Sequence, residues 1–170
     1  GWNMVNGYVN HISMSNQTQA KKPTPAGWPR ISPAVFYQDA ASAIDWLCNV
    51  FGFEVRLKVE GEGGRIEHSE LTFGDGLIMV GSVEGRADRD APLPCHSPKE
   101  LGGTNTQCLA IFVDDADAHC AHARAQGATI VCEPTTTDYG DDYWADRTYR
   151  AVDPEGHNWW FMERVRDPGQ

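Results

Sequence analysis

The feature that most constrains this chain is an internal repeat, in which a strand, a helix and three further strands are expected twice in the same order. In both copies an aspartate that can cap a helix is followed at the same distance by a glycine that can end it, over 39–52 and again over 114–127. A glycine-containing turn then recurs near the end of each copy, at 73–76 and 153–156. Two copies of a β-α-β-β-β pattern predict an α+β fold built from two similar modules.

Hydrophobic periodicity and turn residues place the expected elements within each copy. A cap, a terminating glycine and apolar residues at helical spacing predict a helix at 40–50, and 116–126 has the same place in the second copy. On that second helix, His119 and His122 are expected to face solvent. Strands are expected at 31–38, 53–60, 65–73 and 77–82, and then at 107–113, 128–133, 147–152 and 157–163.

Two stretches fall outside the repeat and set the expected domain boundaries. Residues 1–27 are polar and lack periodicity, which predicts a flexible tail; Met14 is a candidate native start, with 1–13 as added sequence. Residues 84–106 hold three prolines and three glycines, which predicts a long connector loop. The first module is therefore expected at 28–83 and the second at 107–166.

Charge and cysteine content narrow the possible partners. The net charge of −10 argues against nucleic acid as a partner, because phosphates are neutralised by clustered Lys and Arg. The same charge is compatible with a cationic small ligand. No apolar run is long enough to span a bilayer, so no membrane partner is expected. The five cysteines are scattered, without a Cys-x-x-Cys motif, which indicates reduced thiols in a cytoplasmic protein.

Four short segments of the chain resemble motifs of the vicinal oxygen chelate superfamily, in particular its glyoxalase/bleomycin resistance protein-like group. They are Phe-Tyr-Gln-Asp at 36–39, Phe-Val-Asp-Asp at 112–115, Thr-Asp-Tyr-Gly at 137–140 and Asp-Pro-Glu-Gly-His at 153–157. The resemblance covers 31–164. It implies that the sheets of the two modules curve into a cup that holds a ligand, and that two copies of the chain form a homodimer.

The resemblance also raises the question of a metal. Metal-dependent members of the superfamily place one ligand from each of four strands in the cup, usually His, Gln or Glu. The positions carried over to this chain are Ser32, Met79, Cys108 and Trp160, with Val80 in place of Met79 if the register shifts by one. None of these side chains is a histidine or a carboxylate, so neither a metal nor another cofactor is expected. An alternative metal set requires His68, Glu70 and His157 to converge.

Aromatic residues crowd the end of the chain and indicate a surface for stacking planar ligands. By the register of the superfamily, Trp160 is expected on the cup face, with Trp159 and Phe161 in the core. Trp160 either lines a pocket or plugs the cup as part of the core, and the sequence leaves both readings open. Tyr139, Tyr143 and Trp144 are expected to form an acidic, aromatic rim, since aspartates surround them.

Two classes of function follow, and the sequence leaves open whether the protein is an enzyme. The first is a metal-free protein that sequesters a planar or cationic small molecule, as bleomycin resistance proteins do in antibiotic resistance. The second is a glyoxalase-like lyase or isomerase that uses His68 or Glu70 as its catalytic base. The candidate ligand-binding residues are Ser32, Phe36, His68, Glu70, Met79, Cys108, Tyr139, Tyr143, Trp144 and Trp160.

Overall fold

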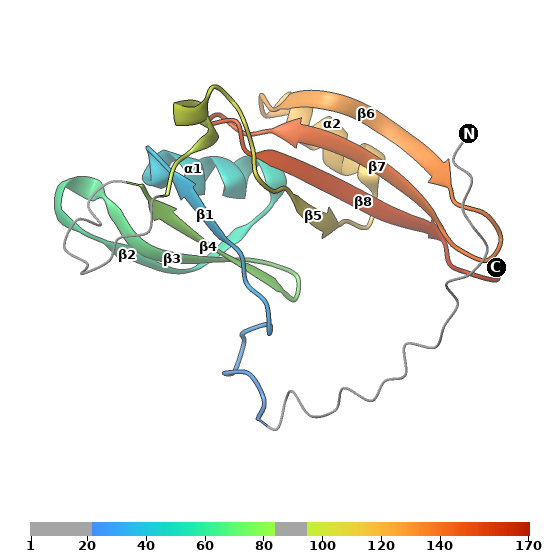
Figure 1. The fold of residues 1–170 in the computed structure, drawn as a ribbon, viewed down its shortest axis with the longest axis horizontal. Coiled ribbons are helices and arrows are strands. Elements are labelled where there is room, and N and C mark those ends of the chain that lie inside the picture. Colours follow the sequence, from blue (N-terminus) through green and yellow to red (C-terminus); the bar gives the residue numbers. More distant parts are fainter. Residues whose placement is uncertain (1–21, 84–94) are drawn as a thin grey trace.

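A computed structural model of the protein describes residues 22–83 and 95–170. Most of the predicted tail and about half of the predicted connector, 1–21 and 84–94, lie outside the described residues. The described chain forms two four-stranded sheets and two α-helices (Figure 1). None of the described helices is long and apolar enough to cross a membrane.

The first module has the predicted order of strands around one helix. Its sheet runs β1-β4-β3-β2, with β1 parallel to β4 and the other neighbours antiparallel. Its elements are β1 (Ala34–Tyr37), α1 (Ala40–Trp46), the π-helical turn η1 (Leu47–Phe51), β2 (Glu54–Glu60), the 3-10 turn η2 (Glu62–Gly64), β3 (Ile66–Phe73) and β4 (Gly76–Ser82).

The second module repeats this topology. Its sheet runs β5-β8-β7-β6, again with its first strand parallel to its last. Its elements are β5 (Leu109–Phe112), α2 (Ala116–Ala125), β6 (Thr129–Asp138), β7 (Ala145–Val152) and β8 (Asn158–Arg166), preceded by the 3-10 turn η3 (Pro98–Leu101). The matching orders of the two sheets confirm the predicted α+β fold.

The caps predicted from the repeat are present at both helices. The Asp39 carboxylate accepts a hydrogen bond from the Ser42 amide at 3.0 Å, and Gly52 ends the first helical segment with φ of 88°. In the second module either Asp114 or Asp115 could serve as the cap, and it is Asp115, whose carboxylate accepts from the Ala118 amide at 2.9 Å. The glycine spacing in the sequence therefore marked real helix ends.

Strand β6 is longer than the predicted 128–133, because a run of β-branched threonines, 135–137, continues it to Asp138. Its pairing with β7 is irregular between Ile130 and Thr135. Pro134 lies in this irregular stretch, on an edge strand where a missing amide donor is tolerated. The hairpin of β6 and β7 therefore extends far beyond the helices (Figure 1).

The two modules share one hydrophobic core, in which aromatic rings from each meet. Helix α2 packs on β6, β7 and β8 and also contacts the η1 turn of the first module. The ring of Phe51 lies 4.7 Å from that of Phe161 and 5.5 Å from that of Trp159. Apolar contact across the module boundary therefore holds the two sheets in a fixed relation.

The expectation that His119 faces solvent is wrong. Its Nε2 donates to the Phe51 carbonyl at 2.8 Å, and its Nδ1 accepts from the Tyr149 hydroxyl at 2.5 Å. Burial lowers the pKa of the ring, which keeps it neutral in this arrangement. The periodicity of α2 describes only contacts with its own sheet, whereas one of the two partners of His119, the Phe51 carbonyl, belongs to the other module. His122 is exposed, and its Nε2 lies 3.0 Å from the Asn49 carbonyl.

The turn between β7 and β8 also joins the modules through two buried carboxylates. Asp153 accepts hydrogen bonds from the Tyr37 hydroxyl at 2.6 Å and from the indole N–H of Trp159 at 3.0 Å. Glu155 accepts from the backbone amides of Gln38 and Asp39, at 2.7 and 2.9 Å. Burial and the adjacent Asp153 raise the pKa of Tyr37 well above its ordinary value, so the phenol stays protonated and donates.

Candidate ligand-binding site

Each sheet has one face that packs on the helices and one that we call its open face. In β8 the side chains of Trp159 and Phe161 are 1% and 0% exposed and belong to the shared core, as predicted. Because side chains alternate along a strand, Trp160 between them lies on the open face, where it is half-buried. The same alternation places Phe36, His68, Glu70 and Met79 on the open face of the first sheet.

On the open face of the first sheet, several predicted residues are brought together. Met79 pairs in register with Ala34 on one side and with Glu70 on the other. Phe36 lies opposite Gly81, where an added Cβ would come within 3.7 Å of its ring. Ser32 precedes β1, and its buried hydroxyl has no hydrogen-bond partner among the described residues.

The polar centre of this face is Glu70, whose side chain is almost fully buried. Its Oε2 lies 2.9 Å from Nε of Arg56, and its Oε1 lies 3.2 Å from Nε2 of His68. The Arg56 guanidinium also stacks over the Trp28 ring, 5.2 Å from its centroid. Arg56 reaches Glu70 from an irregular point in the pairing of β2 with β3. Both oxygens of Glu70 are therefore engaged by the chain itself.

On the open face of the second sheet, Trp160 is the largest side chain. It pairs in register with Ala110 of β5 and with Arg150 of β7. The guanidinium of Arg150 stacks over its ring, 4.5 Å from the centroid. The indole Nε1 is buried and has no hydrogen-bond partner in the part of the chain that the structure describes.

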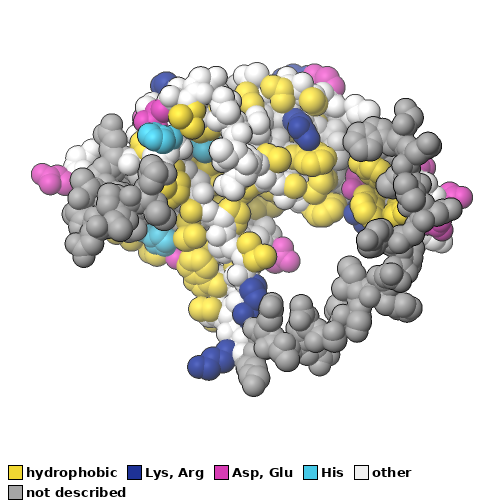
Figure 2. Space-filling view, viewed as in Figure 1, with side chains coloured by type: hydrophobic (Ala, Val, Ile, Leu, Met, Phe, Trp, Pro, Cys, Tyr) yellow, Lys and Arg dark blue, Asp and Glu magenta, His cyan; other side chains and the backbone are white. Residues whose placement is uncertain are grey.

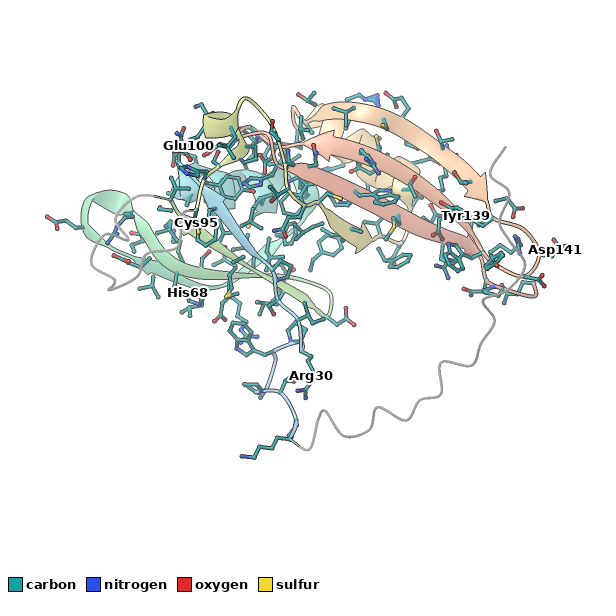
Figure 3. All side chains as sticks on the ribbon, in the orientation of Figure 1. Arg30, His68, Cys95, Glu100, Tyr139 and Asp141 are labelled. Carbon is teal, nitrogen blue, oxygen red and sulfur yellow. The ribbon has the colours of Figure 1, made fainter. Side chains whose placement is uncertain are left out.

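The predicted aromatic rim lies at the tip of the β6–β7 hairpin. Figure 3 shows Tyr139 and Asp141 at the end of the molecule opposite His68, so the rim and the first sheet do not form one site within a single chain. The rings of Tyr139 and Trp144 lie 5.8 Å apart, and those of Tyr143 and Trp144 lie 6.1 Å apart. All three side chains are exposed.

Arginines neutralise part of the acidity expected at this rim. Arg166 lies 2.6 Å from the carboxylate of Asp138, and Arg164 lies 2.6 Å from that of Asp146. A hydrogen bond from the Gly140 amide, followed by the one from Arg166, lowers the pKa of Asp138. Arg164 also stacks over the Trp144 ring, at 5.3 Å.

Several cavities among the described residues lie between the modules, and predicted ligand-binding residues line two of them. One, of about 440 Å³, is largely apolar and includes Cys108 and Phe53 in its lining. The other, of about 250 Å³, is more polar and includes Phe36, His157 and Asn105. Figure 2 shows hydrophobic side chains exposed over both modules on the side in view.

The donor atoms present do not fit a metal site of the vicinal oxygen chelate type. Ser32, Met79, Cys108 and Trp160 offer a hydroxyl, a thioether, a thiol and an indole in place of imidazoles and carboxylates. In the alternative set, Nε2 of His157 bonds the Phe36 carbonyl at 2.7 Å, and Glu70 pairs with Arg56. Within 22–83 and 95–170, no group of three or more His, Cys, Asp or Glu could hold a metal ion.

The sequence analysis did not identify Arg56 and Arg150, whose guanidinium groups stack over aromatic rings. Arg150 had a detectable signal, since counting back across the turn at 153–156 pairs it with Trp160. Arg56 had none, because an irregularity in β2 determines which residue faces Glu70.

Comparison with known proteins identifies a family over most of the chain. The model of the Glyoxalase/Bleomycin resistance protein/Dioxygenase superfamily matches residues 30–161. An uncharacterised protein from Mycobacterium bovis is 32% identical over 143 residues, which cover 82% of this chain and 86% of that protein. A Mycobacterium tuberculosis protein has the same identity over the same length, with 76% of its own chain covered.

Solved structures share the fold. TioX from Micromonospora sp. ML1 is 27% identical, with a TM-score of 0.58, over 81% of this chain and all of its own. A glyoxalase/bleomycin resistance protein/dioxygenase from Nocardioides is 15% identical, with a TM-score of 0.57, over 84% of this chain and 89% of its own. The second likeness, at this identity, concerns the fold alone.

Proposed function

Because the chain belongs to the glyoxalase/bleomycin resistance protein/dioxygenase superfamily, we propose that it is a metal-independent binding protein that sequesters a small planar molecule against Trp160. The observation that carries this proposal is the position of Trp160. Its neighbours Trp159 and Phe161 provide the core, whereas Trp160 is only partly buried on the open face of the sheet. A large aromatic side chain held in this way offers a surface on which planar ligands stack.

The residue types at the superfamily's metal positions support binding without a metal. A thioether and an indole at two of these positions make the surroundings apolar, which favours burial and stacking of a ligand over chelation of its oxygens. Stacking on Trp160 requires that the ligand be planar. The cationic preference expected from the acidic rim has no support at Trp160 itself, where the Arg150 guanidinium already stacks over one face of the ring.

We further propose that the protein is a cytoplasmic homodimer in which the open face of one copy is closed by another. Val55, Leu57 and Val59 on the edge strand β2 are 47%, 42% and 43% exposed. A row of exposed hydrophobic side chains on an edge strand is a typical contact surface. In such an assembly Phe36, Met79 and the hairpin tip of a second copy provide further ligand contacts. Light scattering tests the dimer, and a mass of 18.8 kDa at micromolar concentration would contradict it.

Calorimetry on EDTA-dialysed protein tests the proposed function. We expect a neutral planar probe, naphthalene-2-carboxamide, to bind with one site per chain, and its affinity to be unchanged when Zn²⁺ or Mn²⁺ is added back. Failure of the dialysed protein to bind, with binding restored by a metal, would contradict metal-independent sequestration. If the dialysed protein does bind, an antibiotic-resistance role can be tested by asking whether cells that express the protein are protected from an antibiotic.

A lyase or isomerase is the second candidate, and the contact between His68 and Glu70 favours it. The two side chains lie 3.2 Å apart on one strand, and Glu70 is 6% exposed, as a catalytic pair in a pocket would be. The ion pair between Glu70 and Arg56 weighs against it, because the carboxylate is already engaged. Turnover of a hemithioacetal substrate that disappears in Glu70→Gln, with naphthalene-2-carboxamide binding retained, would establish this alternative.

A further inference from the structure

We propose that the ligand held against Trp160 is an anion, a planar molecule that carries a carboxylate or a similar acidic group. This inference rests on the proposed binding function and adds the charge of the ligand. It arises from Arg150, whose guanidinium stacks over the Trp160 ring at 4.5 Å on the open face of the second sheet.

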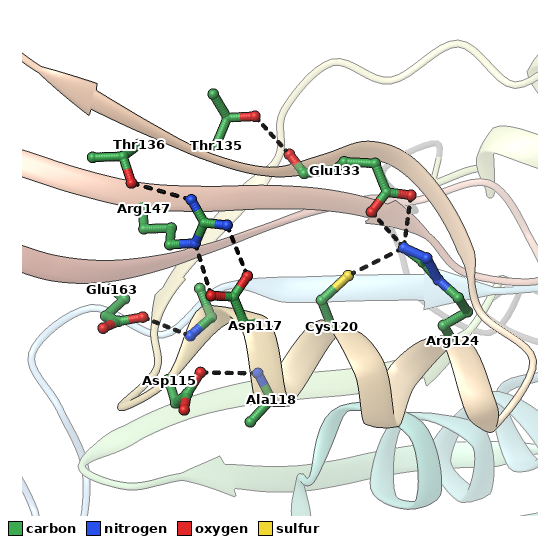
Figure 4. A network of polar contacts seen from close by, with 11 residues as sticks. Asp115, Asp117, Ala118, Cys120, Arg124, Glu133, Thr135, Thr136, Arg147 and Glu163 are labelled. Atoms are coloured by element: carbon green, nitrogen blue, oxygen red, sulfur yellow. Dashed lines mark hydrogen bonds and ion pairs between the residues drawn. The ribbon is translucent and has the colours of Figure 1, made fainter.

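Arg150 differs from the other arginines on the described helices and strands in having no carboxylate partner. Among the residues that the structure describes, every other arginine on a helix or strand makes an ion pair; these are Arg56, Arg124, Arg147, Arg164 and Arg166. Figure 4 shows two of these pairs, in which Arg147 meets Asp117 and Arg124 meets Glu133. A chain with an excess of acidic residues thus leaves a single strand arginine unpaired, next to the candidate ligand surface.

The strands around Arg150 present no acid to neutralise it. Across the sheet, the row that contains it reads Ala110, Trp160, Arg150 and Cys132. The next row towards the hairpin tip reads Phe112, Met162, Thr148 and Thr135. Since directly opposed side chains set the local charge of a sheet face, this part of the open face is positive although the whole chain is negative.

A second donor beside the guanidinium also has no acceptor. The indole Nε1 of Trp160 is buried and makes no hydrogen bond within 22–83 and 95–170. A buried N–H without an acceptor is unfavourable, and a ligand oxygen that reaches it removes that cost. An unpaired guanidinium and an unpaired N–H belong to neighbouring, in-register residues, and together they complement a carboxylate rather than an ammonium group.

Three exposed or partly buried aromatic rings, among them Trp144 of the predicted rim, already hold one of the chain's own cations. Arg164 lies 5.3 Å from the Trp144 ring and 5.5 Å from the Phe112 ring, and Arg150 covers Trp160. A cationic ligand would therefore meet a guanidinium at each of these rings. An anionic ring system gains from the same arginines through both stacking and charge.

Three probes with the same ring system test this inference by calorimetry on EDTA-dialysed protein at low salt. They are naphthalene-2-carboxylate, naphthalene-2-carboxamide and (naphthalen-2-yl)methylammonium. We expect the carboxylate to bind about 10-fold or more tighter than the ammonium probe, as one charge-assisted contact provides. Arg150→Gln should abolish this preference, so that the carboxylate binds no tighter than the ammonium probe. The matched control is Arg124→Gln, which removes an arginine paired on the other side of the sheet and should leave the preference unchanged.

Each other result has a distinct meaning. Equal binding of the two charged probes, tighter binding of the ammonium probe, or an undiminished preference in Arg150→Gln would overturn the inference, and Arg150 would then only pack on Trp160. If the amide still binds in those cases and Trp160→Ala weakens it, the proposed binding function stands without this ligand class. If none of the three probes binds, both proposals fail for planar ligands of this size.

Discussion

The open faces of the two sheets differ in how their charged side chains are partnered, although their strands run in the same order. On the first sheet, Glu70 is buried and meets Arg56 at 2.9 Å and His68 at 3.2 Å. On the second, Arg150 stacks on Trp160 and has no carboxylate partner among the described residues. A repeated backbone therefore carries one face whose central carboxylate is paired within the chain, and one on which the Arg150 guanidinium and the Trp160 indole N–H have no acceptor among the described residues.

The same contrast holds for the turns that end the two modules. The turn at 153–156 places Asp153 and Glu155 inside the protein, where they bind groups of β1 and the start of α1. The corresponding turn at 73–76 is exposed at Asp75. The turn of the second module therefore contributes buried carboxylates that join the two modules, whereas the corresponding turn of the first module does not.

Asp153→Ala should give the largest effect. It removes the acceptor of the Tyr37 hydroxyl and the Trp159 indole, both of which are buried. Each orphaned donor costs about 1–3 kcal/mol, so we expect the free energy of unfolding to fall by roughly 3–5 kcal/mol. Urea denaturation measures it. Asp75→Ala is the matched control and should stay within about 0.5 kcal/mol, as at other exposed sites; equal losses in the two variants would remove the asymmetry between the turns.

Removal of the arginine from each open face should come next in size. Arg56→Gln leaves the buried Glu70 without its cation, and because Arg56 is partly exposed we expect a loss of about 1–2 kcal/mol in stability. Arg150→Gln breaks no ion pair and should change stability by less than about 0.5 kcal/mol. Thermal denaturation of both variants checks this difference. A larger loss of stability in Arg150→Gln would mean that Arg150, like Arg56, has a structural partner within the chain.

A smaller effect is expected from pH, at the contact between α2 and the first module. Burial lowers the pKa of His119 below that of the unfolded chain, where the ring titrates near 6.5. The stability that the neutral ring contributes is therefore fully present above about pH 6.5 and is lost as the pH falls through the lower, folded-state pKa. Denaturation midpoints at pH 7.5 and 5.5 should show a drop in the wild type that is reduced in His119→Gln. The exposed His122 provides the control, since His122→Gln should keep the wild-type drop.

The sequence predicted what depends on local pattern. The spacing of cap and glycine located both helices, the second to within one residue, because Asp39, Asp115 and Gly52 act within a few residues of the backbone groups that they satisfy. Alternation along β8 separated Trp160 from Trp159 for the same reason, since side-chain direction in a strand follows from position alone.

Contacts between modules and across irregular pairing were not predictable in this way. His119 was expected in solvent, because a helical pattern carries no information about the η1 turn that supplies the Phe51 carbonyl. The sequence did not indicate that two aspartates near the predicted rim, Asp138 and Asp146, are paired by arginines 28 and 18 residues further along the chain. Such pairings depend on strand register and on the length of the β6–β7 hairpin, which exceeded the prediction.

Binding of naphthalene-2-carboxamide to Trp160→Ala, with its melting temperature, tests most directly whether the second open face is a ligand site. We expect the free energy of binding to weaken by about 1–3 kcal/mol while the protein stays folded, since one aromatic contact is lost from a partly buried position. Trp46→Phe, a ring on the helix side that packs against Phe51, is the control and should leave affinity unchanged. A loss of about 3–5 kcal/mol in stability with unchanged affinity would contradict the account, because Trp160 would then be part of the core.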